Sequence, residues 1–429
     1  MSVIIIIGGG ASGMMAAITA AQFNKKAKII LIEHGDRLGK KILVTGNGKC
    51  NLTNRNMDIS CYRSDNLSFV EEALSLFGTA DTERFFENIG LLLKEKNGYM
   101  YPYSEQAATV SDVLRGELAR CNVDVQLSTR INKIAAKDNH FEICCEDNKK
   151  FVGDRLILAT GSKASPKTGS DGSGYELAKQ LGHKIIKSLP ALVQLVCEGN
   201  FWKGISGVRC DANVVIKVDD KFICEERGEL QLAEYGISGI PVFQVSRFAV
   251  RALDAGQKVK VIIDFLPALS EEKIFKFIKG QIELSKSVAT VYKCEENNKN
   301  RGTSSKTAEE CLNGLLNKKI TVFMLKEAKI PQSKALSVLS DRELKLIIKL
   351  IKYFETTVTG SKSFDMAQVC SGGVYTTQVD SRTMQSLKTK GLYFVGELLD
   401  VDGICGGYNL QWAWTSGYLA GQDVAKSLM

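Results

Sequence analysis

The hydrophobic pattern of the first 33 residues predicts a strand, a helix and a second strand in succession. Val3–Ile7 is an unbroken β-branched run, which is typical of a strand buried on both faces. Small and apolar residues from Ser12 to Phe23 predict a helix, and Lys28–Ile32 is a second apolar strand. This order of elements is that of a β-α-β unit with parallel strands.

The uncharged stretch between Val3 and Phe23 is also long enough to span a bilayer. No positively charged segment precedes this stretch, and three successive glycines, Gly8 to Gly10, interrupt it. A strand, a glycine-rich turn and a small-residue helix explain the pattern better. We therefore expect neither an export signal nor a membrane span.

Apolar segments in other parts of the chain predict further strands. Residues 123–134 and 151–161 have this character, and so do residues 391–403, which reach a small-residue turn at Gly396 and Glu397. An acid after such a turn lies beside a ligand that crosses the strand ends. Residues 403–428 then predict a glycine turn followed by a helix.

The pattern changes between about Leu189 and Phe354. Residues 209–239 alternate around a turn signal at Asp219 and Asp220, which predicts antiparallel strands. From Ser270 to Phe354 the periodicity is helical, and the polar stretch 295–306 predicts a surface loop. The middle of the chain is therefore expected to form a β-rich part and a helical part.

Composition places the chain among globular proteins of two or three domains, with 429 residues, 44% apolar and 24% charged. The net charge of +8 is a mild excess, and the lysines look scattered, so we expect no nucleic-acid partner. Twelve cysteines without a C-x-x-C pair, and only three histidines, predict no metal site. Unpaired cysteines fit a reducing, cytoplasmic compartment.

The turn between the first strand and the first helix has the spacing of a dinucleotide-binding loop. Gly8, Gly10 and Gly13 form G-x-G-x-x-G, and Glu33 ends the second strand, where it would accept hydrogen bonds from ribose hydroxyls. The helix start offers unpaired N–H groups to a pyrophosphate. An acid at this place argues against the 2′-phosphate of NADP, whereas this stretch alone leaves FAD and NAD open.

Two features near the C-terminal end favour FAD. Glu397 could hold ribityl hydroxyls, which a flavin has and NAD lacks. The helix that begins at Tyr408 would direct its first N–H groups toward N1 and the C2 oxygen of a reduced flavin. Because a helix start contributes about 1 kcal/mol, a lysine or further donors would also be needed.

The segment TGNGKCN, Thr45–Asn51, resembles a phosphate loop at first sight. A Walker loop would need glycine where Leu43 stands and serine or threonine where Cys50 stands. Cys50 also lacks a partner cysteine at a usable spacing for redox chemistry. We therefore interpret the segment as one wall of a flavin site, where glycine allows close approach. Three lysines would offset phosphate or flavin charge there: Lys40, Lys41 and Lys49.

Four motifs together resemble the HI0933/YhiN-like flavoprotein family: residues 39–54, 228–239, 370–374 and 391–417. The family includes aminoacetone oxidase-like enzymes and a 3-dehydro-bile-acid Δ4,6-reductase. The resemblance implies an α/β fold, in which a Rossmann-type, glutathione-reductase-like FAD domain is interrupted by a β-barrel-like and helical insert. The expected boundaries are 1–188 and 355–429 for the FAD domain, 189–268 for the β-rich part and 269–354 for the helical part.

Carried over position by position, the resemblance places thirteen residues near FAD: Gly8, Gly10, Gly13, Glu33, Lys41, Gly46, Gly48, Gly373, Gly396, Glu397, Gly407, Asn409 and Gln411. Residues of the same motifs and predicted strand ends complete the expected FAD site: Ala11, Ser12, His34, Gly39, Lys40, Thr45, Asn47, Asn51, Ile131, Ala159, Thr160, Gly161, Tyr408 and Leu410.

These features predict an FAD-dependent oxidoreductase that transfers a hydride between flavin N5 and a small organic substrate. An NADH- or NADPH-dependent ene or steroid-type reductase is one form, and an amine oxidase that uses O2 is another. No second dinucleotide loop follows a strand, so a nicotinamide donor would enter through the substrate cleft. The acid or base candidates are Tyr408, Asp402 and Lys49.

Two alternatives from other classes stay open. One is a flavoprotein that acts on RNA, and the other is a flavin-binding protein without turnover. The sequence leaves the oligomeric state open.

Overall fold

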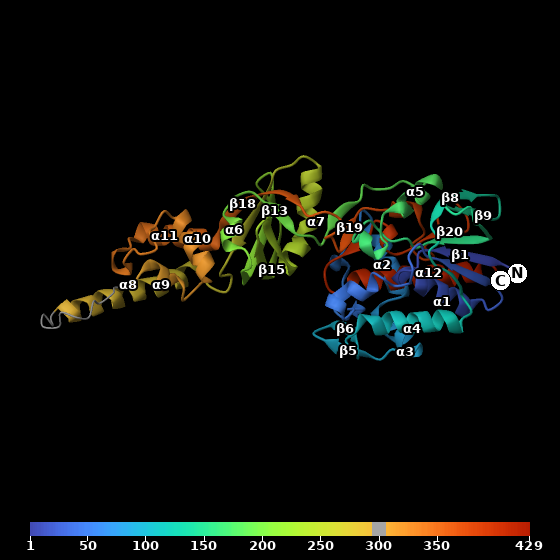
Figure 1. Cartoon of the computed structure of the whole chain (residues 1–429), viewed down its shortest axis with the longest axis horizontal. Helices are drawn as coiled ribbons and strands as arrows, with labels where there is room; N and C mark the ends of the chain where they lie inside the picture. The colour runs from blue at the N-terminus through green and yellow to red at the C-terminus, as the bar shows by residue number, and fades with distance from the viewer. Residues whose placement is uncertain (294–305) are drawn as a thin grey trace. The chain divides into compact units, whose positions relative to one another are not determined.

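The computed structural model describes residues 1–293 and 306–429, with side chains for 1–287 and 306–429. The polar stretch expected to form a loop, residues 295–306, lies outside these residues except for Lys306. The chain forms two compact units, one made of Met1–Leu192 with Ser363–Met429 and the other of Val193–Lys362 (Figure 1).

The first unit is built on a five-stranded parallel sheet with the strand order β20-β11-β1-β2-β7. The strands are β1 (Val3–Ile7), β2 (Lys28–Ile32), β7 (Asp124–Gln126), β11 (Arg155–Leu158) and β20 (Leu392–Phe394). The β-α-β unit is therefore confirmed, with α1 (Ala11–Phe23) between β1 and β2. The edge strand β20 comes from the far end of the sequence, so the sheet joins the first and last parts of the chain.

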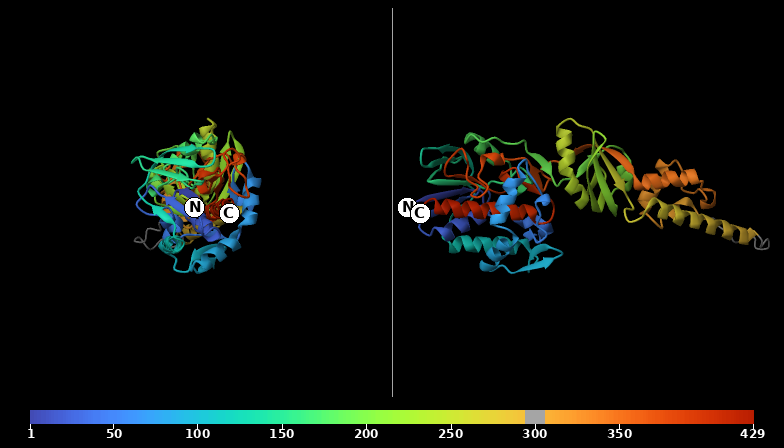
Figure 2. Two further views of the ribbon diagram at one scale, coloured as in Figure 1. Left: turned by 90° about the vertical axis from the view of Figure 1, so that its right-hand side faces the viewer. Right: turned by 180° about the vertical axis from the view of Figure 1, so that it is seen from behind.

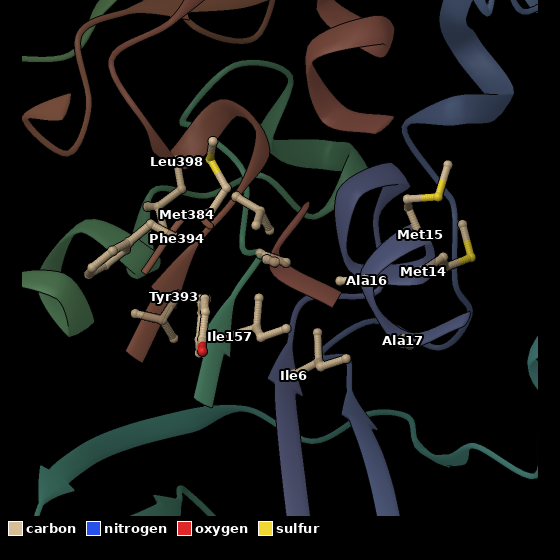
Figure 3. Close-up of a cluster of buried hydrophobic side chains, with 14 of the residues drawn as sticks. Ile6, Met14, Met15, Ala16, Ala17, Ile157, Met384, Tyr393, Phe394 and Leu398 are labelled. Carbon is tan, nitrogen blue, oxygen red and sulfur yellow. The ribbon is translucent and has the colours of Figure 1, made fainter. Parts of the chain in front are cut away.

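Helices α1 and α12 (Tyr408–Lys426) pack directly against each other, as the rear view in Figure 2 shows. Gly417 and Gly421 make this approach possible. A methyl group on Gly417 would lie 2.5 Å from the carbonyl oxygen of Ser12, and one on Gly421 would lie 2.6 Å from that of Ala16. Met14 and Met15 of α1 belong to the same buried core as Phe394 of β20 (Figure 3).

Two segments expected to be single strands are each divided in two. Residues 123–134 give β7 and β8 (Ile131–Ala136), separated by a turn in which Ser128 adopts φ 51°. Residues 151–161 contribute to β10 (Lys150–Gly153) as well as to β11. Strands β8, β9 (Phe141–Cys145) and β10 form a separate antiparallel sheet, because each segment changes sheets at its break.

Shorter elements complete the first unit. They are a 3₁₀ segment (Ile42–Gly48), β3 (Thr53–Asn54), β4 (Tyr62–Arg63), α2 (Leu67–Leu76), α3 (Thr79–Asn88), β5 (Leu93–Lys96), β6 (Tyr99–Pro102), α4 (Ala107–Arg120), α5 (Ser173–Gln180), β12 (Leu189–Ala191), β19 (Val369–Ser371) and β21 (Asp402–Gly403). In neither unit does a described helix combine the length and the apolar character that a membrane crossing requires.

The second unit contains a closed six-stranded barrel with the order β13-β16-β15-β14-β17-β18. Its strands are β13 (Leu195–Cys197), β14 (Arg209–Val218), β15 (Lys221–Ala233), β16 (Gly236–Gly239), β17 (Val259–Asp264) and β18 (Phe354–Ser361), with α6 (Trp202–Ile205) and α7 (Ile240–Asp254) beside them. Asp219 and Asp220 form the expected turn between β14 and β15, with φ values of 48° and 62°. Alternate residues of β14 and β17 fill the barrel interior, which explains their alternating pattern.

Among the described residues, four helices lie between β17 and β18: α8 (Glu271–Lys293), α9 (Ala308–Leu312), α10 (Lys318–Glu327) and α11 (Asp341–Lys352). Lys352 joins α11 to the barrel, because its ammonium lies 2.6 Å from the carboxylate of Asp264 and donates to the carbonyl oxygens of Leu266 and Leu269. The barrel closes only with β18, after the helices. The second unit therefore extends to Lys362, beyond the boundary at Phe354 that the helical periodicity suggested.

The contact between α1 and α12 predicts a strong penalty for a larger side chain at Gly417. We expect Gly417→Val to lower the free energy of unfolding by about 1–3 kcal/mol or more, because the backbone of α1 must move away. The matched control is Gly116→Ala in α4, where an added methyl group meets no atom within 4 Å. Urea denaturation of both variants tests this, and equal stabilities would contradict the close contact.

Candidate functional site

The glycine-rich loop has the geometry that a dinucleotide requires. Gly8 adopts φ 110°, and a methyl group on it would lie 2.3 Å from the carbonyl oxygen of Ala159. A methyl group on Gly13 would lie 1.9 Å from the carbonyl oxygen of Gly8, so α1 packs tightly on β1. At Gly10, the residue before α1, the same position has no atom within 4 Å. The open side of Gly10 and the uncapped helix start fit a pyrophosphate group.

Glu33 lies at the end of β2 with its carboxylate turned toward this loop. One oxygen accepts a hydrogen bond from Gly9 N at 2.8 Å, and the other accepts from Gly35 N at 2.6 Å. A carboxylate oxygen can accept more than one hydrogen bond, so both retain capacity for ribose hydroxyls. The position of Glu33 therefore fits a contact with ribose hydroxyls, which stays a prediction.

A cavity lies beside Glu33 and extends toward β8. Its walls include two loops that the sequence motifs did not identify, and an ion pair between Arg130 and Asp171 joins these loops. The guanidinium of Arg130 lies 2.8 Å from the carboxylate of Asp171, which also accepts two hydrogen bonds from Ser173. Although burial raises the pKa of Asp171, Ser173 and Arg130 outweigh that effect and hold the pKa at about 2. The lining residues are Ile7, Gly8, Ile32, Glu33, His34, Thr129, Arg130, Ile131, Thr160, Gly169, Ser173 and Leu177.

Lys41 and Glu397 form an ion pair 2.5 Å long, although 356 residues separate them. Ser162 donates to the same oxygen of Glu397 at 2.9 Å. Gly396, just before Glu397, packs against Ser12 at the start of α1, where an added methyl group would lie 2.5 Å from the Ser12 hydroxyl. The pair therefore lies next to the start of α1, where a lysine could offset the charge of a bound phosphate.

The start of α12 offers donors and an acceptor together. Gly407, with φ 95°, precedes the helix and leaves its first N–H groups without a side-chain cap. Asn51 Oδ1 is buried with no donor among the described residues, and a methyl group on Gly407 would lie 3.0 Å from it. An isoalloxazine ring presents both acceptors and an N–H donor along one edge. The residues at this place therefore fit the pyrimidine edge of a flavin.

Two other residues expected near the flavin use their side chains to hold the loop at the start of α12. The side chain of Asn409 bonds the backbone of Gly403 and Ile404. Gln411 is fully buried, and its amide contacts the hydroxyls of Thr53 and Thr415. Both fix the position of the helix start.

The segment TGNGKCN folds as a tight turn with a run of left-handed residues. Gly46, Asn47, Gly48 and Cys50 have φ values of 55°, 54°, 82° and 57°. The thiol of Cys50 is buried, and this raises its pKa to about 12. Such a thiol stays protonated at neutral pH, so Cys50 does not have the properties of a redox cysteine.

Ala11 lies at the start of α1 and Leu410 in the first turn of α12. Six further expected residues fall into two groups. Four lie along the sheet edge and the Glu397 turn: Gly39, Ala159, Gly161 and Gly373. Two lysines form ion pairs: Lys40 with Asp36 at 2.6 Å, and Lys49 with Glu105 at 2.9 Å on the surface. The sequence could not show the partner of Lys49, because Glu105 becomes its neighbour only in the fold, whereas Asp36 lies four residues before Lys40.

The acid or base candidates differ in environment. The Tyr408 hydroxyl donates to the carbonyl oxygen of Asn56 at 3.0 Å. Burial raises the pKa of this hydroxyl above the usual value, and the neighbouring Cys61 side chain raises it further. Asp402 is buried in β21. Lys49 is half exposed, and Glu105 raises its pKa. Tyr408 is the one placed at the start of α12.

Comparison with known proteins identifies the class. The profile of the HI0933-like protein Rossmann domain matches residues 2–423. The chain therefore belongs to the HI0933-like Rossmann family, and it is an FAD-dependent oxidoreductase.

The chain is 42% identical over 426 residues to a protein of Clostridium scindens named "3-dehydro-bile acid delta(4,6)-reductase", covering 99% of this chain and 100% of that protein. It is 29% identical over 429 residues to an Escherichia coli protein named "Ribosomal RNA dihydrouridine synthase", covering 99% and 98%. A Haemophilus influenzae protein of the same name is 27% identical over 427 residues, covering 98% of each chain.

The turn geometry predicts that Gly46 and Cys50 differ in importance. We expect Gly46→Val to weaken FAD binding about tenfold or more, because a β-branched residue at positive φ costs about 1–3 kcal/mol. Its Cβ would also lie 3.0 Å from Asn51 N. Cys50→Ser should change the dissociation constant less than about threefold, since a hydroxyl is smaller than the thiol it replaces. Flavin fluorescence titration measures the FAD affinity of both variants. An equal loss of affinity in the two would contradict a purely structural role for Cys50.

The Arg130–Asp171 pair predicts a selective effect on the adenosine part of the cofactor. We expect Arg130→Ala to weaken FAD binding about threefold to fivefold, in the range of a partly exposed ion pair. Binding of FMN, which lacks adenosine, should not change. The double variant Arg130→Ala/Asp171→Ala should lose little more than either single variant. Equal weakening of FAD and FMN would show that the pair does not act at the adenosine end.

Proposed function

We propose that the protein is an FAD-dependent reductase of a carbon–carbon double bond conjugated with a carbonyl group, in a 3-oxo steroid of the 3-dehydro bile acid class. The observation that carries the proposal is the 42% identical relative, which aligns along its whole length and is named for that reduction. NADH or NADPH is the proposed electron donor.

Bound FAD, once reduced, would supply the hydride for the β-carbon of the enone. The chain itself must then deliver a proton to the α-carbon. We propose Tyr408 as that donor, because its raised pKa keeps the hydroxyl protonated at neutral pH. Lys41 and the uncapped start of α12 would stabilise negative charge on the cofactor. Asp402 and Lys49 are the other candidates for proton transfer.

A second candidate substrate is uridine in ribosomal RNA. It is favoured by the relatives named "Ribosomal RNA dihydrouridine synthase", which align with 98% or more of this chain. Dihydrouridine forms when two hydrogens are added across the C5–C6 bond of uracil, which is conjugated with the C4 carbonyl. The two candidates therefore require the same chemistry on different substrates.

Anaerobic half-reactions separate these possibilities. We expect NADH or NADPH to bleach the yellow holoprotein, and a 3-oxo-Δ4,6 steroid to restore its colour without O2. Reoxidation by unmodified ribosomal RNA, with dihydrouridine detected by mass spectrometry, would favour the second candidate. Reduction by an amine and reoxidation only by O2 would favour an oxidase. If no reductant bleached the flavin, the protein would be a flavin binder without turnover.

Tyr408→Phe gives a sharper test of the proton donor. We expect the variant to retain FAD and its rate of reduction, because the lost hydroxyl donates to the backbone carbonyl of Asn56. Its reoxidation by the enone should slow by about 10²-fold or more if the hydroxyl is the general acid. An unchanged reoxidation rate would remove Tyr408 from the mechanism.

A further inference from the structure

The positive charge of the chain is concentrated in its helical segment. Residues 269–354 contain 17 lysines and arginines and 10 acidic residues, a net charge of +7. The other 343 residues contain 39 basic and 38 acidic side chains. The apparent scatter of the lysines therefore conceals a basic segment next to an almost neutral remainder.

Helix α11 arranges part of this charge on one face. At about 100° per residue, Arg342, Lys345 and Lys349 fall within an arc of about 60°, and all three are exposed. The opposite face of the helix is buried by Leu344, Ile347, Ile348 and Ile351. The neighbouring acids are engaged elsewhere, since Asp341 pairs with Lys279 and Glu343 pairs with Lys334. No described acidic side chain forms an ion pair with the three cations of the exposed face.

An aromatic side chain continues the same face. Tyr353 follows the last turn of α11 at the angular position of the three cations, and 53% of the residue is exposed. Its hydroxyl donates to Glu271 at 2.8 Å, which fixes one end of the ring. The ion pair between Lys352 and Asp264 anchors this end of α11 to the barrel. The face is therefore held in place by contacts on its other sides.

We propose that this face, made of Arg342, Lys345, Lys349 and Tyr353, binds structured RNA. Cations about one helical turn apart can follow a phosphate backbone, and an exposed aromatic ring can stack on an unpaired base. A membrane surface fits less well, because an interfacial helix needs a free apolar face. The apolar face of α11 is buried in the core, and Leu346 is the one exposed apolar side chain that lies between the cations of this helix. The proposal does not depend on which substrate the flavin reduces.

The experiment measures binding of the full-length holoprotein to unmodified transfer RNA, which contains helices and unpaired loops, at several salt concentrations. We expect the triple variant Arg342→Glu/Lys345→Glu/Lys349→Glu to bind at least tenfold more weakly than the wild type. The slope of log K against log salt should decrease in magnitude by about 2, for three lost phosphate contacts. Tyr353→Ala should weaken binding without changing the slope, whereas Tyr353→Phe should bind like the wild type.

The matched control is Lys25→Glu/Lys26→Glu/Lys137→Glu, which makes the same charge change at exposed positions of the first unit. We expect this control to bind RNA within about twofold of the wild type, with the same slope of log K against log salt. Equal weakening by both triple variants would overturn the proposal, because overall charge would then explain binding. Equal or tighter binding to duplex DNA or to phosphatidylserine vesicles through the same residues would also overturn it.

Circular dichroism and flavin content show whether the charge-reversed variant is folded. If it is not, Lys345→Gln/Lys349→Gln keeps the proposal testable, with an expected loss of about threefold or more and a slope change of about 1.5. Wild-type binding that does not depend on salt would overturn the proposal as well.

Discussion

The contact between the backbones of α1 and α12 is the constraint on which the site depends. Gly417 and Gly421 remove the side chains that would otherwise hold the helices apart. Helix α1, whose start is expected to bind the pyrophosphate, is thereby fixed to α12, whose start is proposed to face the flavin ring. A shift of one relative to the other would also move Gly396 away from Ser12, and with it the turn that carries Glu397. The relative position of the two helix starts is therefore a consequence of helix packing in the core.

Charge in the first unit is balanced along the proposed cofactor path. Glu33 is held by backbone N–H groups, Glu397 by Lys41 and Ser162, and Asp171 by Arg130 and Ser173. Protein contacts already hold each carboxylate in place, so ligand binding would cost little side-chain conformational entropy at these positions. The two ends of the path differ, because the adenosine end is bordered by an ion pair at the surface and the flavin end by a helix start.

The sequence predicted the parts of the fold that depend on local pattern. The glycine loop, its flanking strands, the helices of the insert and the last helix are all present where hydrophobic periodicity indicated them. Periodicity could not show the break at Ser128, since a single left-handed residue leaves no apolar signature. It also could not assign β18 to the barrel, because its partner strands lie far away in the sequence. The partners of Lys41, Lys49 and Arg130 were missed for the same reason.

The pairing of β13 with β18 brings the two ends of the inserted unit together. Leu195 lies opposite Ser361 in that pair, and Lys362 N donates to the carbonyl oxygen of Gln194 at 3.0 Å. The chain therefore enters and leaves the insert at adjacent points, as circular permutation and domain grafting require. A short linker from residue 192 to residue 363 would close the parent domain. The insert is in this sense a detachable module, which could be exchanged between relatives while the cofactor-binding framework is kept.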